Sequence, residues 1–442
     1  MNKGFKEFHF IDIVSKDKGF LRGPFGGSLK KEIFIPKGKN TYKVYEQGVV
    51  LRKNIKIGDY YIKEEYFNEK MYRFEVCPRD FLVSCSGANY GAIFQMPESI
   101  EKGIINQALL RIRLNNKLIN DKYFDYFFSH HLVNQIIGKK GDSTIPNFPP
   151  VSVLKKLKIK IHSCIDYQKQ IAKVLSDLDS KIEVNNRINQ ELEAMAKTLY
   201  DYWFVQFDFP DAHGKPYKTS GGKMVYNEEL KREIPEGWDV ATLLDIANFV
   251  NGIACQKYRP EEKEDFYRVI KIREMGSGFT DNSEFVSTKI PEKVVVNDGD
   301  VLFSWSATLA VKIWTGGKGA LNQHIFKVTS KKYPRSYYYF ELLNYLQHFK
   351  MIADLRKTTM GHITQDHLKQ SRIVIPPKNI INFLDRKLEP ILNQIVLKQK
   401  QNQKLTELRD WLLPMLMNGQ VRVGEVESEL GMVAEEGGAY EK

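Results

Sequence analysis

One stretch of this sequence limits the possible folds more than any other: residues 165–204 carry the apolar repeat of a long helix. The repeat advances in alternating steps of three and four residues, and its members are Leu175, Leu178, Ile182, Asn185, Asn189, Leu192, Ala196, Leu199 and Trp203. Such spacing places a narrow stripe along one helix face and is typical of a coiled coil. Because a narrow apolar stripe is stable only against another helix, the sequence predicts a partner helix elsewhere in the chain.

The best candidate for that partner is residues 380–418, near the other end of the chain. Its stripe consists of Leu388, Ile391, Ile395, Lys398, Asn402, Leu405, Leu412 and Leu416, and Arg409 also interrupts it. An antiparallel alignment of the two stripes places Asn185 opposite Asn402 and Asn189 opposite Lys398, with apolar layers on both sides and Arg409 opposite Leu178. Polar residues in such a seam often fix its register. The alternative is a plain solvated stripe near a frayed centre.

The two halves of the chain resemble each other in the same order. The run Asp80–Ser84 corresponds to Asp300–Ser304, and Ile105–Leu109 corresponds to Leu321–Ile325. Aromatic helix candidates begin at Tyr123 and Tyr337, and residues 155–161 correspond to 369–375. The offset stays near 213 to 220 residues and also relates the two long helices. Chance similarity rarely keeps register over so many unlike elements, so we interpret the chain as an internal duplication.

The predicted fold class is α+β, with two mixed α/β globular domains separated by two long helices that form an antiparallel coiled coil with pseudo-two-fold symmetry. Strands are expected over residues 42–51, and the stretch 208–236 looks like a connecting loop. The expected segments are a first globular domain at 1–164, a central helix and linker at 165–212, a second globular domain at 213–378, a C-terminal helix at 379–420 and an acidic disordered tail at 421–442.

The net charge of +12 is distributed unevenly along the chain. Residues 1–164 hold 28 Lys and Arg against 16 Asp and Glu, and residues 213–378 hold 25 against 19. Residues 165–212 hold only 5 against 9. Positive charge is therefore concentrated in the two globular segments, which is expected of a protein that meets nucleic acid at two places.

The sequence offers no positive case for catalysis, metal binding or a membrane span. Its four cysteines lack CxxC spacing, so buried or free thiols are the expected state. The sequence contains neither a G-x-x-x-x-G-K-[ST] phosphate loop nor a compact nucleophile set. No apolar run approaches the roughly 18 residues of a membrane span, and the first residues lack a signal-peptide core. We expect a cytoplasmic location.

Taken together, the chain resembles the specificity subunit of type I restriction-modification systems over nearly its whole length. The order of globular domain, long helix, globular domain and long helix is similar to that family. Local sequences also agree, including Pro235–Trp238, Leu243–Ala247, Ile375–Pro377, Ile171–Asp179 and Leu199–Phe207. The first half departs from the family pattern, because it opens around Phe8–Asp12 without a Pro-x-Gly-Trp sequence and has Ile161–Gln168 before its helix.

This resemblance implies that each globular segment is a target-recognition domain that reads one half of a split double-stranded DNA site. It also implies that the helices set the spacing and dock DNA adenine methyltransferase subunits, within a complex that includes restriction and translocase subunits. The chain would then be non-catalytic and bind no cofactor, with S-adenosylmethionine, ATP and magnesium on the partner subunits. Residues 175–203 would span roughly 40 Å as a helix, close to one turn of B-DNA at about 34 to 36 Å.

The candidate DNA contacts are basic and polar residues in loops, such as those beside the glycine turn, after Ser86-Gly87 and before Pro146. In the first domain they are Arg22, Lys30, Lys31, Asn89, Tyr90, Lys139, Lys140 and Thr144, and in the second they are Lys257, Arg259, Lys271, Arg273, Lys357 and His362. For each basic residue taken alone, an ordinary solvated surface role is the more common one. We expect Tyr337, Tyr338 and Tyr339 to pack in a helix, and the Asn-Gln pairs at 106–107 and 322–323 to form hydrogen bonds within turns. Two other functions compete: a free-standing nuclease and a coiled-coil interaction scaffold.

Overall fold

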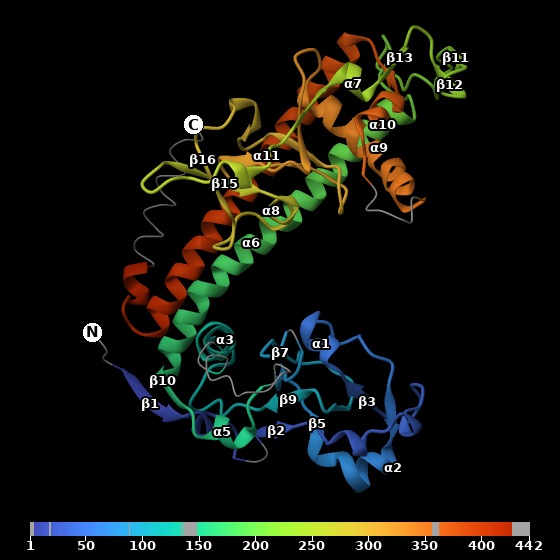
Figure 1. Cartoon of the computed structure of the whole chain (residues 1–442). Coiled ribbons are helices and arrows are strands. Elements are labelled where there is room, and N and C mark those ends of the chain that lie inside the picture. The colour runs from blue at the N-terminus through green and yellow to red at the C-terminus, as the bar shows by residue number, and fades with distance from the viewer. Residues whose placement is uncertain are drawn as a thin grey trace. The chain divides into compact units, whose positions relative to one another are not determined.

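The computed structural model describes residues 4–16, 19–87, 89–133, 136, 148–355 and 362–426 (Figure 1). The chain divides into two compact units. Unit 1 comprises Met1–Ser180 and Leu405–Lys442, and unit 2 comprises Lys181–Lys404. Each unit therefore contains one globular domain together with segments of both long helices. The predicted division into five segments stays a prediction.

The globular domain of unit 1 contains two four-stranded sheets, with strand orders β4-β3-β8-β5 and β2-β9-β6-β7, and a two-stranded sheet β1-β10. Strands β3 and β8 are parallel, whereas the other pairs are antiparallel. The strands are β1 (Phe5–His9), β2 (Phe20–Arg22), β3 (Thr41–Tyr45), β4 (Tyr61–Lys63), β5 (Glu75–Val76), β6 (Phe81–Ser84), β7 (Ile93–Gln95), β8 (Gly103–Ile105), β9 (Leu109–Ile112) and β10 (Lys158–His162). The helices are α1 (Gln47–Leu51), α2 (Glu64–Tyr66), α3 (Asp121–Tyr126), which continues into a π-helical turn at Phe127–Leu132, and α5 (Val151–Lys155).

The globular domain of unit 2 has the same topology. Its sheets are β16-β15-β20-β17, β14-β21-β18-β19 and β13-β22, and β15 and β20 are again the parallel pair. The corresponding strands are β13 (Asp239–Thr242), β14 (Asn248–Asn251), β15 (Phe266–Ile270), β16 (Phe285–Ser287), β17 (Val295–Val296), β18 (Val301–Ser304), β19 (Ala310–Ile313), β20 (Gly319–Leu321), β21 (Ile325–Thr329) and β22 (Arg372–Ile375). The helices are α7 (Leu243–Ile246), α8 (Ile272–Ser277), α9 (Arg335–Leu355) and α10 (Gln365–Gln370). The predicted duplication is thus present in the strand order itself.

Single side chains repeat between the units as well. The carboxylate of Asp80 accepts a hydrogen bond from the Cys77 backbone N–H at 2.7 Å, and Asp300 accepts one from Asn297 at 2.8 Å. Each aspartate thereby closes the turn that leads into the central strand of a sheet. The first half also opens like the second, although their sequences differ there. Residues 9–12 and 242–245 form the same turn, in which an Asp side chain accepts from the backbone three residues earlier at 2.8 Å.

Three local expectations need correction. The expected strand at 42–51 ends at Tyr45, and the helix α1 follows, with Val49 and Val50 both buried. The expected loop at 208–236 contains the hairpin of β11 (Met224–Asn227) and β12 (Arg232–Pro235). The expected disordered tail begins with a helical turn at residues 423–426, since Val423 and Val426 are buried in the core of unit 1. Residues 427–442 lie outside the described part of the chain.

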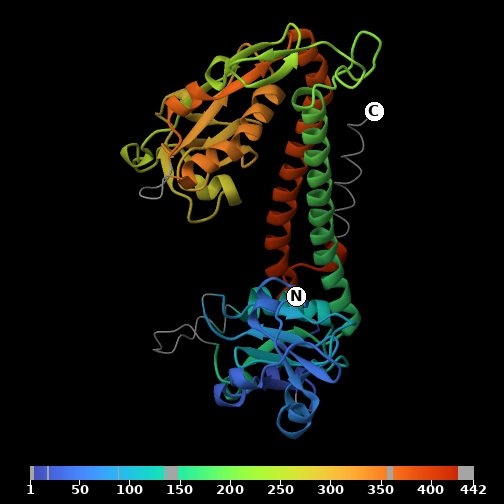
Figure 2. The same ribbon diagram turned by 90° about the vertical axis from the view of Figure 1, so that its right-hand side faces the viewer.

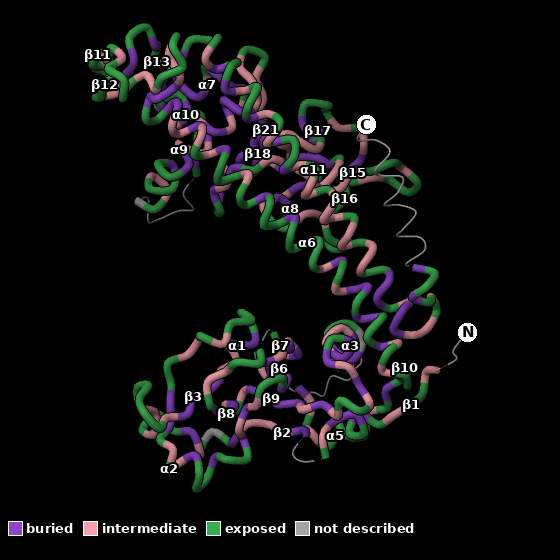
Figure 3. The backbone as a smooth tube through the Cα atoms, turned by 180° about the vertical axis from the view of Figure 1, so that it is seen from behind, coloured by how far each residue is buried: buried purple, intermediate pink, exposed green. Residues whose placement is uncertain are grey.

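The long helices α6 (Ile165–Tyr200) and α11 (Lys378–Met417) lie side by side and run antiparallel (Figures 1 and 2). Buried positions recur along both helices at helical spacing, as the purple segments in Figure 3 show. The most deeply buried members of the predicted stripes are Leu175, Leu178, Asn185, Asn189, Ala196, Trp203, Leu388, Ile395, Leu412 and Leu416, whereas Ile182, Leu192, Leu199, Ile391, Lys398, Asn402 and Leu405 keep partial exposure. On α11 the face that contacts α6 differs from the predicted stripe by one residue near position 391. Leu392 is buried there, whereas the predicted Ile391 is only partly buried.

The polar positions of the seam form specific hydrogen bonds. In unit 2 the Asn185 amide nitrogen donates to the Asn402 side-chain oxygen at 2.9 Å, which is the predicted pairing. Asn189 donates to the backbone oxygen of Ile395 at 3.4 Å. In unit 1 Arg409 pairs with Asp179 at 2.8 Å, so its charge is compensated by the neighbour of Leu178. The predicted pairing of Asn189 with Lys398 is not among the described hydrogen bonds, in which Lys398 donates to Gln401.

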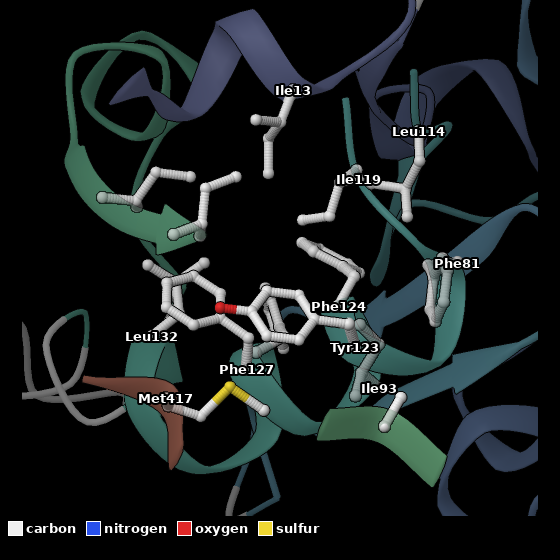
Figure 4. Close-up of a cluster of buried hydrophobic side chains, with 14 of the residues drawn as sticks. Ile13, Phe81, Ile93, Leu114, Ile119, Tyr123, Phe124, Phe127, Leu132 and Met417 are labelled. Carbon is white, nitrogen blue, oxygen red and sulfur yellow. The ribbon is translucent and has the colours of Figure 1, made fainter. Parts of the chain in front are cut away.

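Each globular domain packs against its own segment of the helix pair. In unit 1 a hydrophobic core joins α3 and its π-helical turn to α6 and α11, and Figure 4 shows Met417 beside Tyr123 and Phe127. Tyr126 on α3 also donates to Asp179 on α6 at 2.5 Å. In unit 2 the hydroxyl of Tyr200 at the end of α6 donates to Glu341 on α9 at 2.6 Å. Within each unit the domain is therefore fixed to the helices by apolar packing and by a carboxylate.

The Asn185–Asn402 pair gives a stability prediction. Replacing either residue with Ala should lower the free energy of unfolding by about 1 to 2 kcal/mol, because the remaining amide loses its partner. The double variant N185L/N402L should recover that loss, since an apolar layer replaces a polar one in which the buried Asn185 side-chain oxygen accepts no hydrogen bond. Denaturant unfolding of the parent, the two single Ala variants and N185A/N402A measures the coupling, and R187A on the exposed side of α6 serves as control. Strict additivity of the two Ala substitutions would refute the pairing.

The Tyr200–Glu341 contact predicts a pH dependence. Burial raises the pKa of Glu341 from 4.5 to about 7. As pH rises from about 4.5 through 7, the unfolded chain releases this proton first, so the group progressively favours unfolding. The E341Q variant escapes this penalty, which is on the order of 2 kcal/mol because the residue keeps partial exposure. We expect E341Q to melt higher than the parent at pH 8 but not at pH 5, whereas Y200F should retain the parent's pH dependence. A difference in melting temperature between E341Q and the parent that stays constant with pH would contradict this assignment.

Candidate nucleic-acid interface

In unit 1 several loops meet where β2, β3, β6 and β8 end. The backbone N–H of Gly23, just after β2, donates to Leu109 at 2.9 Å. The N–H of Asn106, after β8, donates to Tyr45 at the end of β3 at 3.0 Å. These backbone bonds hold the loops together without using their side chains. We call this set loop cluster 1, and it consists of residues 22–29, 46–47, 84–87, 89–91, 106–108 and 148.

Two further backbone bonds close the cluster. The Cys85 N–H donates to Ala108 at 2.8 Å, and the Phe148 N–H donates to Cys85 at 2.9 Å. The chain that returns after the α3 region is therefore attached to the loop that follows β6. As a result, segments separated by more than 100 residues in the sequence form one continuous surface.

Unit 2 builds the same arrangement with different side chains. Gly252 N–H donates to Ile325 at 3.1 Å, and Asn322 N–H donates to Ile270 at 3.1 Å. Trp305 takes the place of Cys85, since its N–H donates to His324 at 3.3 Å and its backbone oxygen accepts from Ile363 at 3.0 Å. Loop cluster 2 consists of residues 251–257, 271–272, 304–309, 322–324 and 362–363.

A glycine is required at the same place in each cluster. A Cβ atom on Gly23 would lie 1.8 Å from the backbone oxygen of Asn106, and one on Gly252 would lie 2.1 Å from that of Asn322. Real side chains do not tolerate such distances, so these positions need glycine for close backbone approach. The glycine turn and the Asn-Gln turn are thus one structural unit, which explains why both recur in the two halves.

The polar side chains of loop cluster 1 mainly support its backbone. The Gln47 amide donates to the Ser84 hydroxyl at 2.6 Å and to the Ser86 backbone oxygen at 2.5 Å. Arg22 donates to the Phe148 backbone oxygen at 3.3 Å. The Asn106 side chain accepts from the Ala108 N–H at 3.0 Å, which confirms that it acts within its turn.

Loop cluster 2 has an aromatic centre at Trp305. Its indole N–H donates to the Asn251 side chain at 3.2 Å, and its ring lies 5.6 Å from His324 and 5.4 Å from His362. The Asn322 amide donates to the Gln323 side chain at 2.7 Å, again within a turn as expected. Sequence reasoning did not select Trp305 or Gln47. Trp305 follows Ser304, which the repeat aligns with Ser84, and this position could have identified it.

The residues predicted to contact DNA differ in how far their side chains are exposed to solvent. In unit 1, Lys30, Lys31 and Asn89 are exposed, while Arg22 is partly buried and Tyr90 packs against the hydrophobic core. The candidates Lys139, Lys140, Thr144 and Lys357 lie outside the described residues.

In unit 2, Lys257 and His362 are exposed within loop cluster 2, and Arg259 is exposed just beyond it. Lys271 pairs with Glu284, and Arg273 pairs with Glu274 at 2.6 Å, so their charges are partly compensated. The whole set stays a prediction.

The aromatic run on α9 has a packing role. Tyr337 and Tyr338 are buried, and Tyr339 packs against the same hydrophobic core. The Tyr337 hydroxyl donates to the Val374 backbone oxygen at 2.8 Å. As expected from the sequence, these rings belong to the core of unit 2.

The chemical groups of both clusters suit recognition better than bond cleavage. Burial raises the pKa of the Cys85 and Cys255 thiols to about 11, so both stay protonated and poorly nucleophilic near neutral pH. Throughout the described residues, no group of three or more His, Cys, Asp and Glu side chains could hold a metal ion. In the same part of the chain, no helix is both long and apolar enough to span a membrane. What the clusters expose is amides, hydroxyls, aromatic rings and cations, the groups that bind base edges and phosphates.

Comparison with known proteins identifies the family. The type I restriction modification DNA specificity domain matches residues 30–194 and again 235–407, which together form most of the chain and reproduce its duplication. The MjaIX specificity subunit of Methanocaldococcus jannaschii, a type I restriction enzyme component, is 27% identical over 354 residues, covering 78% of each chain. The HindI specificity subunit of Haemophilus influenzae is 24% identical over 359 residues, covering 69% of this chain and 76% of that protein.

The fold is also found in a solved structure. The S subunit of a type I restriction-modification system from M. genitalium superposes with a TM-score of 0.54 at 14% identity, covering 93% of this chain and 96% of that one. Two matched domains, a duplicated topology and a paired-helix connection agree with one another. The chain therefore belongs to the family of type I restriction-modification DNA specificity subunits.

Proposed function

We propose that this chain recognises a bipartite DNA site, with loop cluster 1 contacting one half and loop cluster 2 contacting the other. The observation that carries the proposal is the repetition of one loop framework with different exposed side chains. The same four backbone hydrogen bonds and the same clamped glycine occur in both units. A framework that is kept while its surface residues change is what two readers of different sequences require.

Positive charge and side-chain chemistry support a division of roles within each cluster. Exposed lysines such as Lys30, Lys31 and Lys257 would contact phosphates and position the domain, since such contacts carry little sequence information. Amide, hydroxyl and aromatic groups would contact base edges in the grooves. The specificity would therefore reside in the loops, and the sheets behind them would serve as their support.

We propose that the helix pair α6–α11 sets the distance between the half-sites and docks the methyltransferase subunits. The exposed side of α6 supports a docking role, because Val184, Ile188 and Met195 follow one another at helical spacing and remain solvent-exposed. S-adenosylmethionine, ATP and magnesium would be bound by the methyltransferase and restriction subunits, and the target adenine would be flipped into the methyltransferase. The complex would act on DNA in the cytoplasm.

Methylation mapping tests the recognition role. The chain co-expressed with its cognate methyltransferase subunit should direct adenine methylation to one motif with two defined halves and an undefined spacer. A combined K30A/K31A variant should weaken DNA binding and reduce the salt dependence of the binding constant, without changing the motif. Methylation of a single continuous motif, or none from an assembled complex, would overturn the proposal.

A paired deletion tests the spacing role. Removing residues 184–190 and 397–403 takes out one heptad from each helix at matching positions. The loss of seven residues shortens each helix by about 10 Å, which corresponds to roughly 3 base pairs of B-DNA. The mapped motif should keep both half-sites and lose about 3 base pairs of spacer. Deleting the heptad from α6 alone is the control and should abolish methylation, because the seams no longer align. A paired deletion that alters the half-site bases would contradict the spacing role.

A further inference from the structure

Phe25 in loop cluster 1 is the most exposed large hydrophobic residue in the described part of the chain. Its exposed fraction is 90%, whereas the next highest value among such residues is 58%, at Met351. Single exposed hydrophobic residues are common on protein surfaces, but they usually keep much of their area covered by neighbours. A phenylalanine that leaves nearly its whole side chain in water gains nothing from packing within this chain.

The backbone that carries Phe25 is firmly held. Before it, Gly23 is clamped against Asn106 and hydrogen-bonded to Leu109. After it, the Ser28 N–H donates to the Phe25 backbone oxygen at 2.8 Å, and the Tyr66 hydroxyl donates to the Ser28 oxygen at 2.7 Å. The adjoining Pro24 and Leu29 are buried. The ring is therefore projected from an anchored turn, and little conformational entropy would be lost on insertion into a partner.

The sequence around Phe25 is rich in basic residues. Arg22 lies three residues before Phe25, and the exposed Lys30 and Lys31 follow shortly after it. Glu32 is the only acidic residue between positions 18 and 45. An exposed apolar side chain in a positively charged loop segment fits a partner that is a polyanion with an apolar interior. Duplex DNA is such a partner, because its stacked bases lie between two phosphate backbones.

We propose that Phe25 is a wedge residue that inserts between two stacked base pairs of the half-site contacted by loop cluster 1. This inference rests on the proposed function, since it takes DNA to be the partner of that cluster. Phenylalanine is among the residues that unstack a base step and kink the duplex in other DNA-binding proteins. The energy needed to open the step depends on its sequence, so Phe25 would select a deformable step at a position where it makes no hydrogen bond to a base.

Unit 2 provides an internal comparison. The turn that corresponds to residues 23–28 is 252–257, and both turns contain a short 3-10 helix at their end, Gly26–Ser28 and Cys255–Lys257. Gly252 aligns with Gly23, so Ala254 stands where unit 1 has Phe25. The methyl group of Ala254 is too short to enter a base step. Wedge insertion is therefore expected in one half-site only.

The test uses the specificity chain assembled with its methyltransferase subunits and a duplex that carries the motif found by methylation mapping. The fluorescent base 2-aminopurine replaces single bases along each half-site, but not the methylated adenines, because base flipping would also unstack them. The assembled parent protein should raise the fluorescence at one step in one half-site and at none in the other. F25A should abolish that signal and weaken binding about 10- to 100-fold with an unchanged salt dependence. F25L should retain part of both effects, because a leucine can also act as a wedge.

Two controls separate a wedge from other roles. F266A removes an exposed aromatic at the end of β15 that lies away from loop cluster 2, and it should leave binding unchanged. Unfolding curves of F25A should match those of the parent, since the ring is exposed. The inference is overturned if F25A binds and unstacks DNA like the parent, if the parent unstacks no base, or if F25A fails to assemble with the methyltransferase. In each case a mapped bipartite motif would still uphold the proposed function, whereas the absence of any such motif would defeat that function first.

Discussion

The pairing of α6 with α11 is the interaction on which the rest of this structure depends. Neither helix has an apolar face wide enough to be stable alone, and each globular domain packs against a segment of both. The polar positions do not simply interrupt this seam. The Asn185–Asn402 bond in unit 2 and the Arg409–Asp179 pair in unit 1 each have a partner at one particular register, and a slipped register would leave buried polar groups unsatisfied. Apolar burial thus supplies affinity between the helices, and the polar pairs supply their alignment.

The loop clusters likewise contain some interactions that hold the structure and others that can vary. Backbone hydrogen bonds and a clamped glycine fix where each loop lies, so the side chains that point outward are free to vary. Cys85 and Trp305 show that the buried positions vary too, because they occupy equivalent backbone positions while one is a buried thiol and the other a partly exposed aromatic ring beside two histidines. A duplicated scaffold of this kind can diverge in its contacts without losing its fold, which is the property that a family of specificity subunits requires.

The parts that could be predicted from the sequence are those encoded by periodicity and repetition. The heptad stripe located both long helices and paired Asn185 with Asn402, and the recurring Asp80–Ser84 and Ile105–Leu109 patterns revealed the duplication. What could not be predicted depends on contacts between residues distant in the chain. That Gln47 supports the loop after β6, or that Gly23 touches Asn106, follows from strand order, which no local pattern encodes. The hairpin at β11–β12 was missed for a related reason, since its Gly-rich and charged sequence looks like a loop until Trp238 packs on Phe207 and Phe209.

Basic residues define a candidate interface less sharply than exposed aromatic rings do, and the reason is physical. A lysine is abundant on any surface, and its charge can be compensated locally, as Lys271 and Arg273 show by pairing with Glu284 and Glu274. An exposed aromatic ring is more informative, because water disfavours it and nothing in the folded chain compensates that cost. Phe25 therefore identifies where a partner must approach more sharply than the excess of positive charge does. In a protein that reads DNA through loops, charge brings the duplex near, and the uncompensated apolar surface marks the point of contact.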